Sequence, residues 1–538
     1  MARTFNLGDL FDITANTVPE RMAVIWDDVR LSYGELAERS DRLAAAMRRR
    51  GLVRGMTMGI LMYNCPAYLE ALLACFKIGV IPFNINYRYG ADELHYILND
   101  AGTDALIYDR EFDPLVHAVT GRLPPLRRIV VDDTSKAEDP DNVVWDNEAL
   151  AYSQALDEPV GDVDLHAGRG DEDRVLLYTG GTTGFPKGVE WSHQAKFFGA
   201  LRGGVITPDD RPIEAPEQLA ARVRGAPSGN LLSLPPLMHG AAMWSSLFSL
   251  LTGQTVILVR SKNFDAEQIW GVVAKEKVGM ITLTSDAMGK PLVEALEANP
   301  GRWDLSSLRA ITWGGAPLSV FLQDAFRRHF PQAWTLSGMG SSESGAIGAG
   351  EIIVDGEGFM RLPPRDDLAV IVDGVRFAQA GELGILARSG FLPEGYWRDP
   401  KKTSETFITL NSRRWVLTGD QARLEADGTM TLLGRGSTCI NSGGEKIFSE
   451  EVESVIRSHP DVRDALVVGM PDERWGQQVA AIVALRADAQ MTLEQLQSYC
   501  VDRLARYKLP RRLVLQPHIK RSPAGKADYR WAASIVSQ

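Results

Sequence analysis

The sequence has few cysteines, and none of them are close to one another. Four cysteines occur in 538 residues, and no two stand in a C-x-x-C arrangement: Cys65, Cys75, Cys439 and Cys500. This spacing does not fit a disulfide framework or a zinc site, and it is typical of reduced thiols in a cytoplasmic protein. The eight histidines form no ligand-spaced pair either. We therefore expect a cytoplasmic protein without disulfides.

An excess of positive charge is also missing. The 58 basic and 69 acidic side chains give a formal net charge of −11. A protein that binds nucleic acid nonspecifically needs excess cations to displace the counterions of the phosphates. We therefore expect small-molecule partners and no nucleic acid.

Long uninterrupted apolar runs are absent as well. The first 24 residues alternate charged and apolar side chains too closely for a signal sequence, so no export is expected. Residues 231–259 contain no charged side chain, but Pro235, Pro236 and Gly253 divide them. The helix that remains has about a dozen residues, whereas roughly 20 are needed to span a membrane. We expect buried core here, and no transmembrane segment.

The chain does contain a long alternation of helix and strand patterns. Ser32 and Glu35 have the S-x-x-E spacing of a capping box, at the start of a helix pattern that Gly51 ends. Strand and helix patterns then alternate through residues 57–109 and again through 266–315. Such alternation predicts an α/β fold with predominantly parallel strands.

The second half of the chain predicts a separate small domain. A single core stops growing at roughly 250 to 300 residues, so this chain should form at least two domains. A glycine-rich connection lies at 434–453, and the residues after it predict a helix from Glu450, strands at 464–470 and 478–485, and a helix at 493–506. We place the boundary near Ser437, which gives a large α/β domain at 1–436 and a small α+β domain at 437–538. A long surface loop at 434–445 is the alternative that composition leaves open.

The stretch "LLYTGGTTGFPKGVEW", at 176–191, predicts a phosphate-binding loop. It follows a predicted buried strand at 175–178. Its glycines let backbone N–H groups converge on one point, its threonines add hydroxyl donors, and Lys187 adds a positive charge. A flexible surface turn has no need of so many donors.

Two common nucleotide-binding motifs do not match this loop. A Walker A motif has Ser or Thr after its lysine and opens directly into a helix, whereas here Gly188 follows Lys187 and Pro186 breaks any helix. We expect the next helix only after Ser192, as its N-cap. The loop's glycines do not give the G-x-G-x-x-G spacing of a Rossmann fold either.

The loop instead resembles the signature of the adenylate-forming superfamily, which comprises acyl-CoA synthetases, adenylation domains and luciferases. Other motifs of that superfamily follow in the expected order along nearly the whole chain: "PPLMHG" at 235–240, "WGGAPLS" at 313–319, "GMGSSESG" at 338–345, "GELGILARSG" at 381–390, "GYW" at 395–397, "TGD" at 418–420, "GRGSTCINSGGEKIFSEEVE" at 434–453 and "KRSPAGKADYR" at 520–530. Within the superfamily, "LPPLMHGA" and the closing motifs look most like an actinobacterial branch of acyl-CoA ligases, which activates steroid side-chain acids and long fatty acids.

The resemblance implies an ATP-dependent acyl-CoA ligase that uses ATP, Mg²⁺ and coenzyme A. A bulky hydrophobic acid would first attack the α-phosphate of ATP, which gives an acyl-adenylate and pyrophosphate. Catalysis of that step consists mostly of positioning and charge neutralisation. The acyl group would then pass to the CoA thiol, with release of AMP. The resemblance leaves open whether the acid is a steroid side-chain acid or a long-chain fatty acid, and whether the enzyme is a homodimer.

The resemblance also assigns residues to the triphosphate and the metal. The β- and γ-phosphates would lie against the loop residues Thr179, Gly180, Gly181, Thr182, Thr183, Gly184 and Lys187, with Thr183 taking part in catalysis. Gly180 stands where the family usually has Ser, so one hydroxyl donor is missing. Glu343 would carry Mg²⁺, with Ser342 beside it in place of the usual Thr, because a hard cation prefers oxygen ligands.

The nucleoside would bind to residues of four other motifs. Adenine would lie against Gly314, Gly315, Ala316 and Pro317, next to Gly340 and Ser341. Met339 replaces the aromatic residue that usually precedes Gly340, which places adenine stacking in doubt. Asp420 would accept hydrogen bonds from the ribose hydroxyls, and Arg435 would contact the same sugar.

Further residues would serve the acyl group and coenzyme A. By composition Lys526 is one solvated lysine among several, but the resemblance assigns it to the developing charge at the α-phosphate. His239 would be a gate at the acyl pocket, beside Met243 and Trp244 on the apolar stretch; a core histidine is the alternative. The pantetheine arm would pass Gly443, Gly444 and Glu445, where Ser449 replaces a usual Pro. Ser437 stands at the hinge position, so the small domain is expected to be mobile.

Two alternatives remain beside a CoA ligase. An acyl-AMP ligase would load a carrier protein, but no carrier domain follows Gln538 and "GGEKIF" favours CoA. A noncatalytic acyl- or nucleotide-binding protein would not need a lysine on a separate domain. The joint presence of Lys187, Glu343, Asp420 and Lys526 argues against it.

Overall fold

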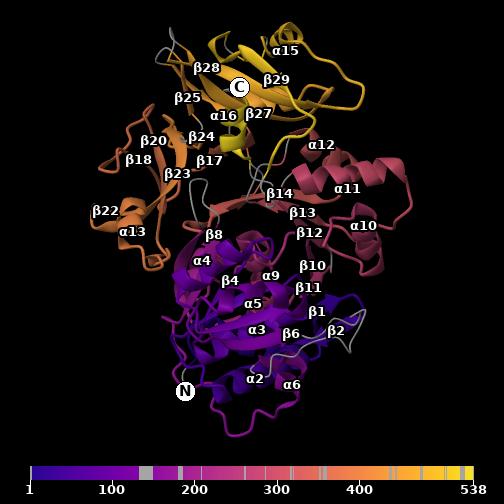
Figure 1. The fold of residues 1–538 in the computed structure, drawn as a ribbon, viewed down its shortest axis with the longest axis vertical. Coiled ribbons are helices and arrows are strands. Elements are labelled where there is room, and N and C mark those ends of the chain that lie inside the picture. Colours follow the sequence, from indigo (N-terminus) through magenta and orange to yellow (C-terminus); the bar gives the residue numbers. More distant parts are fainter. Residues whose placement is uncertain are drawn as a thin grey trace.

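The computed structural model describes residues 3–131, 149–179, 186–207, 209–259, 262–284, 286–314, 318, 320–350, 353–354, 360–435, 439–442, 445–472, 476–501, 503–504, 506–521 and 527–536. Within these ranges the strands form four sheets, three in the large N-terminal part and one in the small C-terminal part. Figure 1 shows an elongated molecule with the small part at the end remote from the N-terminus.

The first two sheets have parallel strands in their interiors, with antiparallel pairs at both edges of the first sheet and at the β21 edge of the second. The first has the order β15 (Gly345–Gly350), β14 (Trp334–Ser341), β13 (Ala310–Gly314), β12 (Met280–Leu283), β10 (Asn230–Ser233), β11 (Thr255–Leu258), β1 (Met22–Trp26) and β2 (Val29–Ser32). The second has the order β21 (Gly395–Tyr396), β9 (Lys187–Ser192), β8 (Arg174–Thr179), β4 (Ile81–Asn84), β3 (Thr57–Leu61), β5 (Ala105–Asp109), β6 (Arg127–Val131) and β7 (Ala149–Ala151). The α/β prediction is confirmed for these two sheets.

The third sheet is antiparallel throughout and was not predicted from the sequence. It has the order β16 (Ile353–Val354), β17 (Met360–Leu362), β24 (Met430–Arg435), β23 (Arg413–Leu424), β20 (Leu383–Ser389), β18 (Leu368–Val372) and β19 (Arg376–Phe377), with β22 (Phe407–Leu410) on β23. It lies between the parallel sheets and the small part in Figure 1.

Helices cover the parallel sheets. They are α1 (Leu7–Thr17), α2 (Tyr33–Arg49), α3 (Pro66–Ile78), α4 (Ala91–Ala101), α5 (Asp113–Thr120), α6 (Tyr152–Asp157), α7 (His193–Gly199), α8 (Gln218–Gly225), α9 (Gly240–Leu251), α10 (Ala266–Lys275), α11 (Asp286–Ala298) and α12 (Val320–His329), with α13 (Pro400–Thr406) beside the third sheet and short 3₁₀ turns at Arg110–Phe112 and Arg202–Gly204. The largest core cluster packs α1, α2, α3 and α9 on the strands.

Local sequence signals place three of these helices as predicted. The capping box of α2 is formed, since Ser32 Oγ accepts from the Glu35 amide at 3.2 Å and the Glu35 carboxylate accepts from the Ser32 amide at 2.7 Å. α7 has Ser192 as its N-cap. α9 has 12 residues, and no helix of the described ranges is long and apolar enough to cross a membrane.

The small part is an α+β unit with its own core. Its sheet has the order β26 (Glu445–Phe448), β25 (Cys439–Ser442), β28 (Gly476–Leu485) and β27 (Val462–Asp472), with β29 (Arg512–Leu515) on β28. Its helices are α14 (Ser449–Arg457), α15 (Leu493–Cys500) and α16 (Tyr529–Val536), with a 3₁₀ turn at Arg506–Lys508. Two apolar clusters lie on the two faces of this sheet.

Two sequence predictions for this unit were wrong in detail. Residues 439–442 and 445–448 are paired strands of the sheet rather than a connection or surface loop, because Ile440 and Ile447 pair and are buried in its core. The helix predicted at 493–506 ends at Cys500, where the amides of Arg503 and Leu504 both donate to the Cys500 carbonyl. That turn brings Leu504 into the core.

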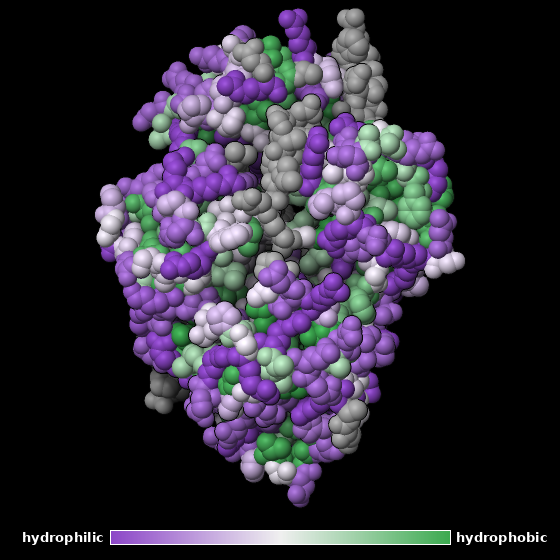
Figure 2. All heavy atoms as spheres, turned by 180° about the vertical axis from the view of Figure 1, so that it is seen from behind, coloured by the Kyte–Doolittle hydropathy of each residue, from purple (hydrophilic) through white to green (hydrophobic). Residues whose placement is uncertain are grey.

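The small unit contacts the large part through described residues. The Arg486 guanidinium lies 5.8 Å from the centroid of the Phe321 ring, which belongs to α12. The predicted hinge, Ser437, lies outside the described residues, so the boundary at 436/437 stays a prediction. On the face in Figure 2, hydrophilic residues dominate and apolar ones are scattered.

Candidate active site

A hairpin of β8 and β9 carries the glycine-rich loop. In its antiparallel register, the Cα of Thr179 lies opposite that of Lys187. The hairpin therefore brings the two ends of the loop together. Five predicted phosphate-binding residues lie outside the described residues, and their roles stay predictions: Gly180, Gly181, Thr182, Thr183 and Gly184.

Lys187 has an acidic partner that sequence reasoning missed. Its Nζ lies 2.5 Å from Asp399 Oδ2 and 5.8 Å from the centroid of the Tyr396 ring. The hydrogen bond from Lys187 is the largest cause of the lowered pKa of Asp399. Asp399 also caps α13, because it accepts from the Lys402 amide at 2.9 Å. A triphosphate that binds Lys187 therefore competes with an ionised carboxylate.

Tyr396 joins Lys187 to Glu343. It lies on β21, which pairs with β9 so that Tyr396 is opposite Val189. Its hydroxyl donates to Glu343 Oε1 at 2.9 Å. Burial, reinforced by the Glu343 carboxylate, raises the pKa of Tyr396, so the phenol keeps its proton and remains a donor. The structure thus brings two predicted residues, Lys187 and Glu343, to the two sides of one tyrosine.

The turn that carries Glu343 is held by its neighbours. The Ser344 amide donates to Ser341 Oγ at 3.0 Å, and the Ser341 amide donates to Ser344 Oγ at 3.0 Å. The buried Arg388 donates to the carbonyls of Ser344 and Gly199. The Trp191 indole N–H donates to the Ser342 carbonyl at 3.0 Å. These contacts fix the backbone of the turn from both ends.

The donor set of this turn fits Mg²⁺. A Glu343 carboxylate and a Ser342 hydroxyl are hard oxygen ligands of the kind that magnesium prefers, and both side chains are half-buried rather than sealed in the core. Because Tyr396 orients Glu343 by one oxygen, the carboxylate is positioned before any metal binds. The metal-binding role of these two residues stays a prediction.

The predicted adenine strip is described only at its start. Gly314 ends β13 opposite Gly338, and a Cβ at Gly314 would lie 3.2 Å from the Gly338 carbonyl oxygen. Only glycine fits comfortably at this approach of two strands. Gly315, Ala316 and Pro317 lie outside the described residues. Met339 packs against the core of the third sheet, while Gly340 adjoins Gly345 too closely for a side chain.

The two predicted ribose residues are neighbours. In the pairing of β23 with β24, Asp420 lies opposite Arg435. The Asp420 amide donates to Thr418 Oγ1 at 3.1 Å, and Gly419 between them has a φ of 80°, which favours glycine. The Arg435 side chain lies outside the described atoms. The register therefore supports a shared role for the two residues without testing it.

His239 is the residue that precedes α9. It is half-buried, and the Met243 amide donates to its carbonyl at 3.0 Å. Met243 is buried in the large core cluster and Trp244 packs against it. The gate role of His239 stays a prediction.

A buried asparagine that sequence reasoning missed connects these motifs. Asn84 Nδ2, on β4, donates to the carbonyls of Tyr178 at 2.8 Å and Met238 at 2.7 Å, and its Oδ1 accepts from the Tyr178 amide at 2.7 Å. Asn84 thereby fixes the "LMHG" segment to the strand that leads into the phosphate loop. A polar residue in the apolar stretch "VIPFNINY" was the signal that could have revealed it.

Three of the predicted site residues of the small unit lie outside the described residues: Gly443, Gly444 and Lys526. Glu445 opens β26 opposite Ser442, its side chain undescribed. Arg521 and Ala527, the described residues on either side of Lys526, form a bridge, and Arg521 is bound by Asp464 through two contacts of 2.7 Å.

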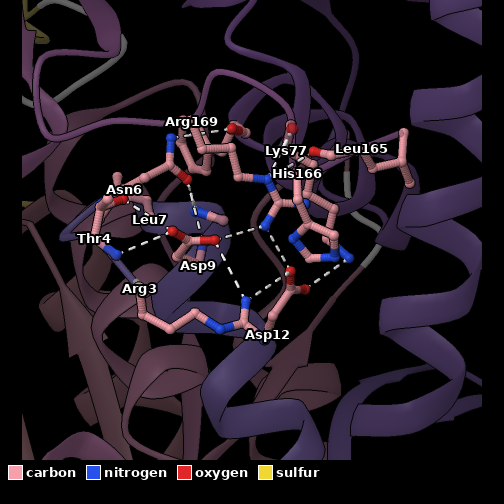
Figure 3. Close-up of polar contacts among 12 residues, drawn as sticks. Arg3, Thr4, Asn6, Leu7, Asp9, Asp12, Lys77, Leu165, His166 and Arg169 are labelled. Carbon is pink, nitrogen blue, oxygen red and sulfur yellow. Dashed lines mark hydrogen bonds and ion pairs between the residues drawn. The ribbon is translucent and has the colours of Figure 1, made fainter. Parts of the chain in front are cut away.

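A separate acidic cluster near the N-terminus is not a metal centre. Oxygen and nitrogen atoms of Asp9, Asp12 and His166 lie within 4.8 Å of one another. Cations already occupy the carboxylates, however: Arg169 Nη1 lies 3.0 Å from Asp9 and 2.6 Å from Asp12, and Lys77 Nζ lies 3.0 Å from Asp12 (Figure 3). A metal ion would have to displace two buried cations, so this cluster is structural.

Comparison with known proteins agrees with the motif order. Residues 11–397 match the family model of the AMP-binding enzymes, and residues 451–526 match that of the AMP-binding enzyme C-terminal domain. The medium-chain acyl-CoA ligase Mig of Mycobacterium avium is 40% identical, over 96% of each chain. The 3-oxocholest-4-en-26-oate–CoA ligase of Rhodococcus rhodochrous is 39% identical, over 98% of this chain and 95% of that one.

A solved structure shows the same fold. The anthranilate CoA ligase AuaEII, in complex with anthranoyl-AMP, superposes with a TM-score of 0.81 at 23% identity and covers 98% of both chains. At 23% identity, this structural similarity supports only the fold. The family rests on the sequence matches. The adenylate-forming resemblance is confirmed, and the chain belongs to the family of AMP-binding enzymes.

Proposed function

We propose that this protein is an ATP-dependent acyl-CoA ligase that activates a bulky hydrophobic carboxylic acid, either a long-chain fatty acid or a steroid side-chain acid. The observation that carries the proposal is the meeting of Lys187 and Glu343 at Tyr396, beside the glycine-rich hairpin. The two curated relatives act on a medium-chain acid and on a steroid side-chain acid by name.

In the first step, an oxygen of the acid's carboxylate attacks the α-phosphorus of ATP. The new P–O bond forms the acyl-adenylate, and the bond to pyrophosphate breaks. Lys187 would leave Asp399 and bind the β- and γ-phosphates instead. The positive charge of Lys187 is then balanced by the phosphates rather than by the Asp399 carboxylate. Glu343 and Ser342 would hold Mg²⁺, which neutralises phosphate charge when bound.

In the second step, the CoA thiol attacks the acyl carbon. A C–S bond forms, the bond to AMP breaks, and the thiol proton leaves to solvent. We propose that the small unit turns about Ser437 between the steps, so that Lys526 serves the first and the Gly443–Gly444 loop serves the second. One described contact between the units is between the Arg486 guanidinium and the half-exposed ring of Phe321, which a turn of the small unit can break without opening a core.

We also propose that the enzyme works in the cytoplasm. The three cysteines whose side chains are described, Cys65, Cys75 and Cys500, are free thiols. Unbridged thiols are usual in a reducing compartment.

Acid-dependent pyrophosphate release is the test of this function. The purified protein would be given ATP and Mg²⁺ with steroid, fatty and aryl acids in turn, with and without CoA. We expect turnover with the large apolar acids and a thioester product only when CoA is present. No acid-stimulated pyrophosphate release with any acid would reject the proposal, and adenylate formation without thioester would favour the carrier-loading alternative.

The substitution Glu343→Gln tests whether this activity depends on the candidate site. The substitution keeps the size of the side chain and a hydrogen-bond partner for Tyr396 but removes the charge, so turnover should fall by roughly 10²- to 10³-fold. Glu405→Gln, on the exposed side of nearby α13, is the matched control and should change little. Equal activity of Glu343→Gln and the wild type would remove Glu343 from the mechanism.

A further inference from the structure

A fully buried lysine lies between two tryptophans near the candidate site. Lys196, on α7, is 0% exposed. Its Nζ lies 5.4 Å from the ring centroid of Trp191 and 4.7 Å from that of Trp244. The two indoles are nearly perpendicular, with centroids 6.4 Å apart. Among the described residues, no side chain or carbonyl forms a hydrogen bond or ion pair with this Nζ.

A second donor in the same place also has no acceptor. The indole N–H of Trp244 is buried, and no described atom accepts from it. Aromatic faces attract a cation, but they do not accept a full hydrogen bond from each N–H. Buried polar groups in proteins are almost always hydrogen-bonded, and a leucine or methionine would fill this space at lower cost. Two donors without an acceptor indicate that an oxygen atom from elsewhere completes the group.

We call Lys196, Trp191 and Trp244 together the Lys196 box. The box adjoins both the turn that carries Glu343 and the predicted acyl pocket. Trp191 donates its indole N–H to the Ser342 carbonyl, next to Glu343. Trp244 lies on α9, one turn after His239, on the stretch predicted to line the acyl pocket. A Cβ at Gly240 would lie 3.1 Å from Leu177 and 3.7 Å from Trp244, so α9 packs directly on the strand that leads into the phosphate loop. The box therefore lies between the turn that carries Glu343 and helix α9, which is predicted to line the acyl pocket.

We propose that Lys196 and Trp244 bind an uncharged oxygen, a ketone or a hydroxyl group, that the acid substrate carries away from its carboxylate. This inference rests on the proposed function and refines its substrate: an oxygenated hydrophobic acid rather than a plain one. A plain alkyl chain would leave both donors unpaired. A site built to hydrogen-bond a substrate atom discriminates strongly against the analogue that lacks it.

The state of the lysine favours a neutral oxygen over a second carboxylate. Burial lowers the pKa of Lys196 to about 7. Near neutral pH, the neutral amine is therefore well populated, and it still donates N–H bonds. A second carboxylate would bring a further charge into the same desolvated space, which costs more than a ketone or hydroxyl does.

The test compares paired acids of one carbon skeleton, with and without the oxygen. The panel would contain long-chain fatty acids with a ketone or hydroxyl at successive positions, and steroid side-chain acids with and without a ring ketone. Each acid would be assayed with ATP and CoA for its kcat/KM. For the wild type, we expect the oxygenated acid of at least one pair to be preferred by roughly 10- to 100-fold.

Substitutions in the box should then remove that preference. Lys196→Met keeps the length of the side chain without a donor, and we expect the ratio within the favoured pair to fall to about one. Trp244→Phe keeps an aromatic ring without the N–H and should lower the ratio in part. Lys275→Met, an exposed lysine on α10, is the control and should keep the wild-type ratio. Thermal melting of each variant verifies that it folds.

The outcomes separate this inference from the proposed function. If the wild type turns over no acid at all, the proposed function fails. If it turns over acids but prefers no oxygenated partner, or if Lys196→Met keeps the preference, the inference is wrong while the function stands. An equal change for both acids of a pair, as expected if an ordered water completes the box, would also reject the inference.

Discussion

Two lysines of this protein are equally buried and have opposite surroundings. Lys77 and Lys196 are both 0% exposed. Lys77 Nζ lies 3.0 Å from Asp12 Oδ1 and 2.5 Å from Asp41 Oδ1. Lys196 has two indole faces and, among the described residues, no carboxylate. Lys77 is thus a buried lysine paired with carboxylates, whereas Lys196 is a buried lysine without an anionic partner in the described part of the chain.

The network around Lys77 has a clear structural purpose. Figure 3 shows Lys77 with Asp9, Asp12 and Arg169, which come from α1, the end of α3 and the segment before β8. Asp41 adds α2. Burial raises the pKa of Asp12, but Lys77 and Arg169 together outweigh it, and the pKa is lowered overall. Asp12 thus stays charged, and the ion pairs of Lys77 join α1, α2 and α3 to one another.

The largest expected effect is therefore on stability, at Lys77. Lys77→Met would leave the buried Asp12 and the half-buried Asp41 without this cation, and removing one partner of a buried ion pair costs about 3–5 kcal/mol. Urea unfolding followed by hydrogen exchange in α1 and α3 would measure the loss. Lys275→Met is the control and should stay within about 0.5 kcal/mol of the wild type. A loss of less than about 1 kcal/mol would show that the network is dispensable.

At Lys196, substitution by methionine is expected to raise the stability of the protein, whereas at Lys77 it is expected to lower it. Burial lowers the pKa of Lys196 from its ordinary value of 10.5 to about 7 in the folded protein. Between these values the unfolded state binds more protons, so the wild type gains stability as the pH rises from 7 to 10.5. Lys196→Met lacks this dependence. It should be more stable than the wild type by about 2 kcal/mol at pH 7, with the difference shrinking toward pH 10.

Thermal melting across that pH range measures both parts of the prediction. A variant that is less stable than the wild type at pH 7 would show that the Lys196 box is a structural feature like the Lys77 network. The comparison between the two lysines would then lose its functional meaning. A stability cost that is relieved by an apolar residue is instead what a ligand-binding group is expected to show.

Sequence alone could not separate these two lysines. Each stands in a helix among apolar neighbours, in "ACFKIG" and "HQAKFF". What distinguishes them comes from far along the chain: Asp12 and Asp41 in one case, Trp244 in the other. Side chains more than a few residues apart meet only through tertiary packing, which local patterns do not record.

The same limit explains which parts of the fold and site were predicted. Caps at Ser32 and Ser192 depend on residues within three positions, and both were correct. Asn84 and Asp399 act on segments about 94 and 212 residues away, and neither was identified. Motif order supplied Glu343 and Lys187, but Tyr396 as their link required the pairing of β21 with β9.

The small unit contains a third buried ionisable side chain, the carboxylate of Glu453. Unlike Lys196, it has polar partners. Glu453 is 2% exposed; its Oε1 accepts from the Val467 amide at 2.9 Å, and Arg457 lies 3.4 Å from its Oε2. Burial raises the pKa of Glu453 from 4.5 to about 7, against the weaker opposing effects of Arg457 and the Val467 amide. Glu453 is thus intermediate between Lys77 and Lys196 in how well its charge is compensated.

The smallest effect is expected from Glu453→Gln. Between pH 4.5 and 7 the folded wild type binds more protons than the unfolded chain, so its stability falls as the pH rises through this window. Gln keeps an oxygen for the Val467 amide and has no proton to lose, so the variant should lack this decline and exceed the wild type by roughly 1 kcal/mol at pH 7. Hydrogen exchange of β27 at pH 5 and pH 7 isolates the small unit from the rest of the chain. Identical pH dependence in the two proteins would mean that Glu453 stays ionised in the core, and that its partners, which include Arg457, the Val467 amide and the Tyr529 hydroxyl, compensate a buried charge as fully as the network of Lys77 does.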